Sequence, residues 1–193
     1  KRQPPPPAAF FAITNPDNPH AVARSIARKA TYNAWVAATP NLEADIDTTA
    51  LSLVNAWALT EGHIKAGLRA IHRLNELPAV KFLQDTHCLL DIESLIAIDQ
   101  PMAALSTHNP ATLAVIDCLL AEYFTPTTPN QVFPTRSQIR RKVRDLCKSL
   151  DDTIAYRDTR PQDSYTFSSN GTKAWLELGV DEDTGIKLDA FIR

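Results

Sequence analysis

The stretch TRSQIRRKVRDLCKSL, residues 135–150, decides the fold class. Its apolar side chains recur at intervals of four, three and four residues, which is the spacing of one face of an α-helix. They are Ile139, Val143, Leu146 and Leu150. Thr135 stands before the first turn, where a hydroxyl can accept from free backbone N–H groups. The stretch therefore predicts an amphipathic helix that begins after Thr135 and packs through one apolar face.

Helical signals of the same kind continue toward the N-terminus. Asn18 and Asn109 are each followed by proline, a cap residue before a proline at the first helical position. These pairs predict helices over 19–38 and 110–123. Between them, a proline at position 78 and a capping Asp91 predict two short helices joined by a tight turn. The 78–97 segment also looks like a helix-turn-helix, but its second helix is acidic, which favours internal packing over a DNA groove.

The longest periodic stretch covers residues 47–76 and is expected to be the organising helix. Six of its apolar residues recur at helical spacing: Leu53, Val54, Trp57, Ile64, Leu68 and Ile71. Gly62 and Gly67 each lower helix propensity by about 1 kcal/mol. A bend or break is therefore expected near these glycines.

The two ends of the chain have different patterns. Residues 1–19 are rich in proline and predict an irregular arm, which Phe10, Phe11 and Ile13 are expected to pin to the body. After residue 160 the pattern changes to alternation, with an Asn-Gly turn signal at 170–171, and predicts a β-hairpin. A last amphipathic helix is then expected to run up to Arg193.

Together these signals predict a mainly α fold, a multi-helix bundle with one β-hairpin near the C-terminus followed by a terminal helix. The expected division is a proline-rich arm at 1–19, a helical domain at 20–160, and a hairpin plus helix at 161–193 that continues the same domain. Because the last helix is still apolar at its end, we expect that the natural chain continues.

The composition is that of an ordinary globular protein, with 44% hydrophobic residues, 22% charged residues and a net charge of -2. No run approaches the roughly 18 apolar residues of a membrane-spanning helix, so no membrane partner is expected. The chain has three cysteines, about thirty residues apart and without a metal-binding pair. Sparse cysteines favour a cytoplasmic location.

No catalytic constellation is found in the sequence. It lacks a phosphate-binding glycine loop and a nucleophile elbow, and its histidines are too scattered to predict a metal site. His108-Asn109 imitates part of a nuclease motif, but Asn109 is better interpreted as a helix cap. We therefore predict no cofactor, metal or small-molecule substrate for this chain. Whether the whole protein is an enzyme stays open.

One feature predicts a function: the helix at 136–148 carries six cations and a single acid, Asp145. Arginine binds phosphate through paired donors, and a row of cations gives salt-dependent affinity for DNA of any sequence. The candidate phosphate-binding residues are Arg136, Arg140, Arg141, Arg144 and Lys148. The competing interpretation is a solvated helix face that forms salt bridges with neighbouring acids.

Three stretches, in this order, carry a family resemblance over about residues 45–193. The first is Leu-Pro-Ala at 77–79 with the paired short helices up to 96. The second is the helix from Arg140-Arg141 to the acids at 151–152, and the third is the strands at 165–167 and 175–178 with Asp-Glu-Asp-Thr-Gly at 181–185. In this order they resemble the domain of unknown function that precedes HNH endonuclease domains in many actinobacterial proteins, the thirteen-E-twelve repeat family. Two details differ: the glycine of the turn near 86–88 is missing, and Glu182 replaces a proline.

The resemblance implies a cytoplasmic protein associated with mobile DNA, whose catalytic HNH module, with its divalent metal, would lie beyond Arg193. Together with the basic helix, this favours a non-catalytic accessory domain that positions DNA, or a partner protein, for a nuclease module in the same polypeptide. The alternative is a structural or homo-oligomerisation module in which Trp57, Ile64 and Leu68 pack against a second copy. A stand-alone enzyme is the third hypothesis.

Overall fold

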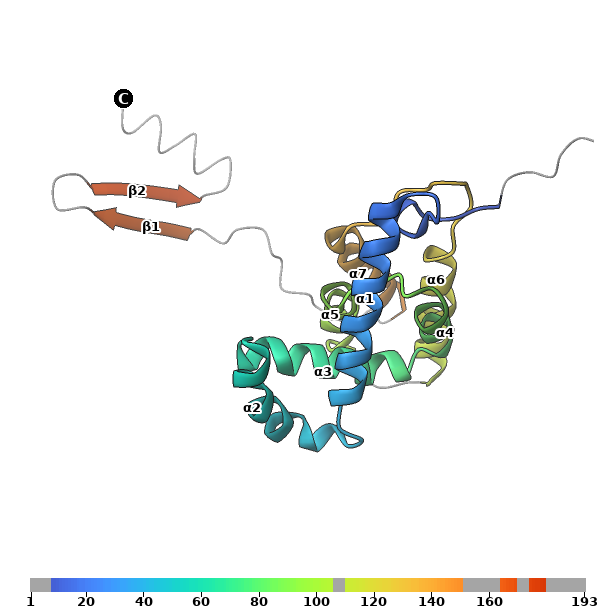
Figure 1. Cartoon of the computed structure of the whole chain (residues 1–193). Coiled ribbons are helices and arrows are strands. Elements are labelled where there is room, and N and C mark those ends of the chain that lie inside the picture. The colour runs from blue at the N-terminus through green and yellow to red at the C-terminus, as the bar shows by residue number, and fades with distance from the viewer. Residues whose placement is uncertain (1–7, 106–109, 151–163, 170–173, 180–193) are drawn as a thin grey trace, which may run out of the picture. The chain divides into compact units, whose positions relative to one another are not determined.

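The computed structural model describes residues 8–105, 110–150, 164–169 and 174–179, and it divides the chain into two units, 1–154 and 155–193. The described part of the first unit is helical (Figure 1). Its elements are η1 (Ala12–Thr14), α1 (Pro19–Ala38), η2 (Glu43–Asp45), α2 (Ile46–Trp57), α3 (Glu61–Asn75), α4 (Pro78–His87), α5 (Ile92–Met102), α6 (Pro110–Tyr123) and α7 (Arg136–Leu150).

Helix starts follow the capping signals of the sequence. The side chain of Asn18 accepts hydrogen bonds from the backbone N of His20 and Ala21, at 3.0 and 3.4 Å, and α1 ends at Ala38 as predicted. Asp91 caps α5 by accepting from the backbone N of Ser94 at 2.8 Å. Both predicted caps are therefore confirmed. Asn109, the third predicted cap, lies outside the described residues.

The stretch at 47–76 forms two helices and not one organising helix, with a break close to the glycines where a bend or break was expected. α2 ends at Trp57, the next residue, Ala58, has a left-handed φ of 52°, and α3 begins after Thr60, whose hydroxyl accepts from the backbone N of His63 at 3.3 Å. The break lies before both glycines, which are helical in α3. A threonine cap therefore separates the helices.

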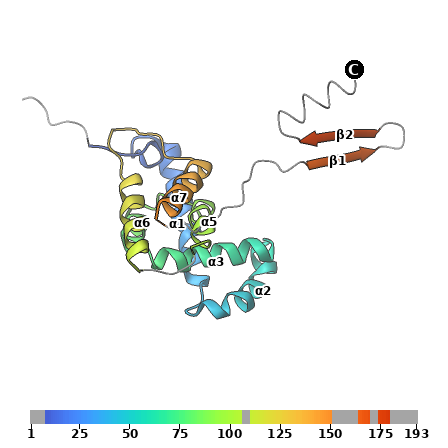
Figure 2. The ribbon, with the colours of Figure 1, turned by 180° about the vertical axis from the view of Figure 1, so that it is seen from behind.

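Helix α5 is the centre of the helical core. It packs most extensively against α7 and α3, and Figures 1 and 2 show it between these two helices. Seven of its eleven residues are buried: Ser94, Leu95, Ile96, Ala97, Ile98, Pro101 and Met102. The internal packing expected for this acidic-ended helix is therefore confirmed.

The turn between α4 and α5 is closed without a glycine. Cys88 takes the left-handed conformation, with φ of 47°, at the place where the resemblance leads one to expect glycine. The buried amide of Gln84 donates to the carbonyl of Leu90 at 2.9 Å and accepts from its backbone N at 2.8 Å. This pair of hydrogen bonds fixes the turn.

The start of α4 is held by a neighbouring helix. Asp117 of α6 is buried and accepts from the backbone N of Ala79 and Val80, at 2.8 and 2.9 Å. A carboxylate at a helix N-terminus satisfies free donors and is favoured by the helix dipole. Asp117 therefore ties α6 to α4.

Helix α1 approaches α3 closely at Gly67. A Cβ atom added at Gly67 would lie 2.4 Å from the ring of Trp35. The Trp35 ring is itself buried and makes an edge contact with Trp57, with ring centroids 4.6 Å apart. Glycine is required here because of this contact, which fixes how α1 crosses α3.

The N-terminal arm is pinned by Phe11, as predicted. Phe11 is buried, makes an edge contact with Phe133 at 5.0 Å between centroids, and forms an isolated bridge with Gln131. The arm is thereby joined to the loop that leads into α7.

The predicted fold class is wrong for the first unit. Its described residues, 8–105 and 110–150, contain helices and no strand, so the helical body carries no hairpin. The strands β1 (Ser164–Ser169) and β2 (Ala174–Gly179) belong to the second unit and pair antiparallel, with Ser164 opposite Gly179. The alternating pattern predicts strands, but it does not show which part of the chain those strands pack against. The expected turn at 170–171 and the terminal helix lie outside the described residues.

Candidate nucleic-acid interface

Helix α7 starts at a reciprocal cap. The side chain of Gln138 accepts from the backbone N of Thr135 at 2.8 Å, and the hydroxyl of Thr135 accepts from the backbone N of Gln138 at 3.4 Å. This arrangement is a capping box, which satisfies donors at both positions. The predicted start of the helix is confirmed.

One stripe of α7 is buried against the body, chiefly against α5. The buried residues are Ile139, Val143, Leu146 and Cys147. Leu150, predicted as the fourth member of the stripe, is 38% exposed, and Cys147 takes its place. The buried stripe fixes which side of α7 faces outward.

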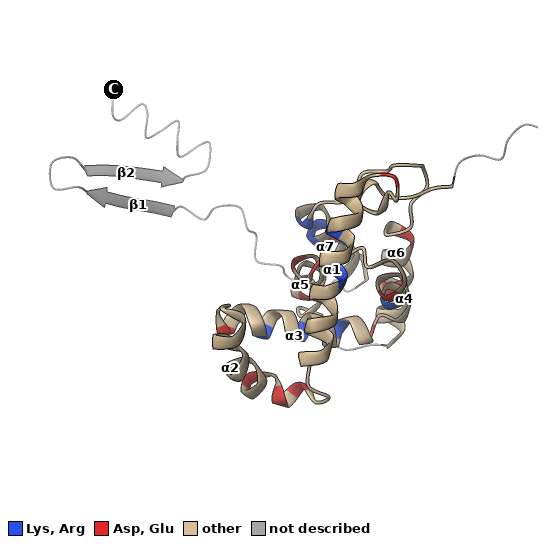
Figure 3. Ribbon diagram, in the orientation of Figure 1, with Lys and Arg blue, Asp and Glu red and all other residues tan. Residues whose placement is uncertain are grey.

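Two of the candidate phosphate-binding residues, Arg140 and Arg141, are exposed on α7. Neither forms a hydrogen bond or ion pair with any residue in the described part of the chain. Figure 3 shows the cations gathered on this helix. Because folding does not engage these two guanidinium groups, both can bind an external anion.

The other three candidates are less free. Arg136 donates from Nη2 to Oδ2 of Asp91 at 2.8 Å, and its Nη1 lies 3.9 Å from Oε2 of Glu93. The hydrogen bond to Asp91 raises the pKa of Arg136. Arg144 is half-buried, and both Arg144 and Lys148 are engaged by other groups. The structure therefore divides the predicted set into two free cations and three engaged ones.

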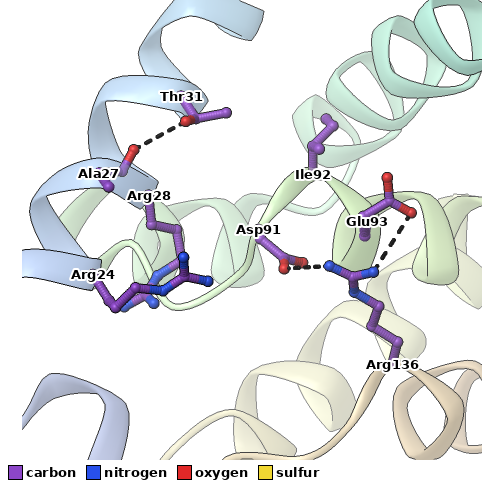
Figure 4. Close-up of a pocket in the computed structure, with 8 residues that line it drawn as sticks. All are labelled: Arg24, Ala27, Arg28, Thr31, Asp91, Ile92, Glu93 and Arg136. Carbon is purple, nitrogen blue, oxygen red and sulfur yellow. Dashed lines mark hydrogen bonds and ion pairs between the residues drawn. The ribbon is translucent and has the colours of Figure 1, made fainter. Parts of the chain in front are cut away.

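Arg136 also lines a cleft of about 200 Å³ between α1, α5 and α7 (Figure 4). Arg24 and Arg28 of α1 point into it from one side, and Asp91 and Glu93 face it from α5. Arg28 is partly used by the fold, because its Nε donates to the carbonyl of Cys88 at 2.6 Å. No spacing in the sequence predicts this cleft. The available signal was the absence of any acid between Asp17 and Glu43.

The two carboxylates of the cleft are held by cations. Burial by itself would raise the pKa of Asp91, but hydrogen bonds from Arg136 and Ser94 outweigh it and hold this pKa below its ordinary value. Glu93 is shared by Arg136 and His63, whose Nε2 lies 3.3 Å from Oε1 of Glu93. The acids therefore hold Arg136 in place at the edge of the cleft.

The described residues contain no group of three His, Cys, Asp or Glu side chains placed to bind a metal ion. His63 pairs with Glu93, while His108 lies outside the described residues. In the part of the chain that the structure describes, no helix combines the length and apolarity needed to cross a bilayer. What the described surface offers chemically is a set of guanidinium groups directed at solvent.

No protein-family model matches this chain, and comparison with curated proteins and with solved structures finds no match.

Proposed function

We propose that this chain is a non-catalytic accessory domain that contacts the phosphate backbone of duplex DNA through α7, in a protein that carries an HNH endonuclease domain. One observation supports the DNA contact most directly: Arg140 and Arg141 are exposed and unpaired within the described residues, on a helix whose other side is buried. The order of the resembling stretches supports the link to HNH proteins.

Contact with phosphate also explains why these cations are arginines. A planar guanidinium donates two parallel hydrogen bonds to phosphate oxygens, and such charge-assisted bonds are roughly twice as strong as neutral ones. No base-reading element is required, so the affinity would depend on salt and not on sequence.

The test is a titration of labelled duplex DNA with the chain at two salt concentrations. For about two to four phosphate contacts, the affinity should fall roughly ten- to a hundredfold between about 50 and 200 mM salt. Two duplexes of unrelated sequence should bind equally. Absence of binding at about 50 mM salt would contradict the proposal.

The matched control compares two double variants of equal net charge. Arg140→Ala with Arg141→Ala should weaken DNA binding strongly. Arg69→Ala with Lys81→Ala removes the same charge from α3 and α4 and should leave most of the affinity. Equal losses in both variants would mean that α7 has no special role.

The link to HNH proteins is tested in the gene. An HNH pattern is expected in the coding sequence that follows Arg193. A stop codon directly after Arg193 would contradict this part of the proposal and leave the DNA contact untouched.

The alternative, self-association through the predicted long helix, is not supported by the positions of its residues. Ile64 and Leu68 have no exposed surface, because both are buried in the core of the same chain. A dimer would have to use other residues, and light scattering at micromolar concentration would detect it.

A further inference from the structure

The positive charge of the chain is concentrated on two helices. α1 carries three Lys or Arg residues and no acid, and α7 carries six with one acid. Together they hold nine of the 20 Lys and Arg residues but only one of the 22 Asp and Glu residues. The rest of the chain is therefore strongly acidic, and the two helices differ from it in sign.

These two helices meet at the cleft that holds Arg136. Arg24 and Arg28 of α1 point into this cleft, and Arg136 enters it from α7 (Figure 4). Arg140 lies one turn beyond Arg136 on α7, about 6 Å along the helix axis. An anionic chain that passes over Arg140 can therefore continue across the cleft toward α1.

Arg24 is the residue that the fold does not use. It is exposed, and it makes no hydrogen bond or ion pair with any residue in the described ranges. It also lies four residues before Arg28, and like charges at this helical spacing repel. Burial is the largest cause that lowers the pKa of Arg28, Cys88 and Asp91 act in the opposite direction, and the charge of Arg24 lowers this pKa by a smaller amount. An anion bound beside Arg24 would relieve this repulsion.

The carboxylates of Asp91 and Glu93 reduce the positive potential of the cleft but do not reverse it. Three guanidinium groups line the cleft against two carboxylates, and Arg136 already pairs with both acids. The excess cation is Arg24, which stands on the opposite side of the cleft from this network.

We propose that Arg24 completes the DNA-binding surface, so that one strand of the duplex backbone crosses the cleft between α7 and α1 and places a phosphate on the Arg24 guanidinium. This inference rests on the proposed DNA contact of α7 and adds a second helix to it. Arg28 is a positioning residue here, because its bonds to the carbonyls of Cys88 and Ile13 hold α1 against the body.

The test uses Arg24→Ala in the full chain, with labelled duplex DNA at several salt concentrations. Loss of one phosphate contact should weaken binding about three- to tenfold at low salt and reduce the slope of log affinity against log salt by about 1. Arg24→Lys, which keeps the charge, should recover part of the affinity. Thermal unfolding should stay the same or shift slightly upward, because Arg24 has no partner in the described fold and its repulsion of Arg28 is removed.

The matched control is Arg69→Ala on α3, which removes the same charge from another helix. Burial raises the pKa of Asp99, and the charge of Arg69 acts against this rise. Asp99 lies eight residues after Asp91, about 12 Å along the helix axis, so Arg69 is far from the cleft. Its removal should leave the salt slope unchanged.

The outcomes separate the two proposals. If the natural chain binds no DNA, both fail. If it binds and the α7 double variant weakens binding, but Arg24→Ala behaves like Arg69→Ala, then α7 acts alone and the inference about Arg24 is wrong.

Discussion

Near its C-terminal end, helix α1 presents Trp35, which is 3% exposed and lies against Gly67. About three turns earlier, beside the cleft, it presents Arg24, which is exposed and unpaired in the described structure. Shape complementarity explains the first residue completely, and nothing in the fold explains the second. The difference separates residues that build the body from residues that the body leaves available for a partner.

The largest effect is expected at Trp35, in the packed part of α1. Trp35→Ala removes a buried ring and should lower the free energy of unfolding by about 3–5 kcal/mol. Val36→Ala, one residue further on, is the matched control, because Val36 is 44% exposed and its truncation should cost less than about 0.5 kcal/mol. Urea unfolding measures both. Similar losses in the two variants would mean that α1 does not pack as described.

A smaller effect is expected at Gly67. The added methyl group of Gly67→Ala would overlap the Trp35 ring, and overpacking of this kind costs about 1–3 kcal/mol, less about 1 kcal/mol gained in helix propensity. Gly62→Ala on the same helix meets no atom within 4 Å and should be neutral or stabilising. In urea unfolding the two identical substitutions should therefore differ by about 1–3 kcal/mol, with Gly67→Ala the less stable.

A double variant sharpens this prediction. In a chain that already carries Trp35→Ala, the ring is absent and Gly67→Ala should no longer destabilise. If the cost of Gly67→Ala stays the same in both backgrounds, the contact with Trp35 is not its cause.

Among the residues that line the cleft, the next effect is expected at Asp91. Its pKa is lowered in the folded chain, so its charge stabilises the fold above the ordinary Asp pKa of about 4, and this contribution is lost as pH falls through the lowered pKa. Asp91→Asn keeps the helix cap but loses the ion pair with Arg136. It should cost about 0.5–1 kcal/mol at neutral pH, because the pair is partly exposed.

The measurement is urea unfolding of both chains at neutral pH and at about pH 3. The difference between them should shrink at the lower pH, because the carboxyl group of Asp91 is then largely protonated in the unfolded chain. A difference that stays constant with pH would show that the ion pair contributes nothing.

Local sequence signals predicted much of the helical unit. The errors lie where contacts between distant segments decide the structure. Asn18 and Asp91 cap their helices through neighbours two or three residues away, so the sequence reveals them directly. The exact position of the break, at Ala58, lies four residues before Gly62, and Trp57 beside it packs on Trp35 from another helix. The left-handed Cys88 is a local feature, because Gln84, four residues earlier, closes the turn, but no glycine marks this position in the sequence.

The candidate site was predicted only along α7, for the same reason. Arg140 and Arg141 share a helix with the apolar stripe, so periodicity places them on its outer side. The hydrogen bond between Arg136 and Asp91 joins two segments that are 45 residues apart in the sequence. The approach of Arg24 to the same cleft likewise depends on tertiary packing, which no spacing in the sequence encodes.

The most direct test of the account is one variant measured in two ways. Arg140→Ala with Arg141→Ala should change the free energy of unfolding by less than about 0.5 kcal/mol, because neither residue has a partner in the described fold. The same variant should lose at least about tenfold in affinity for duplex DNA at about 50 mM salt. A destabilised chain, or one that binds DNA as the natural chain does, would contradict the claim that these arginines serve a partner and not the fold.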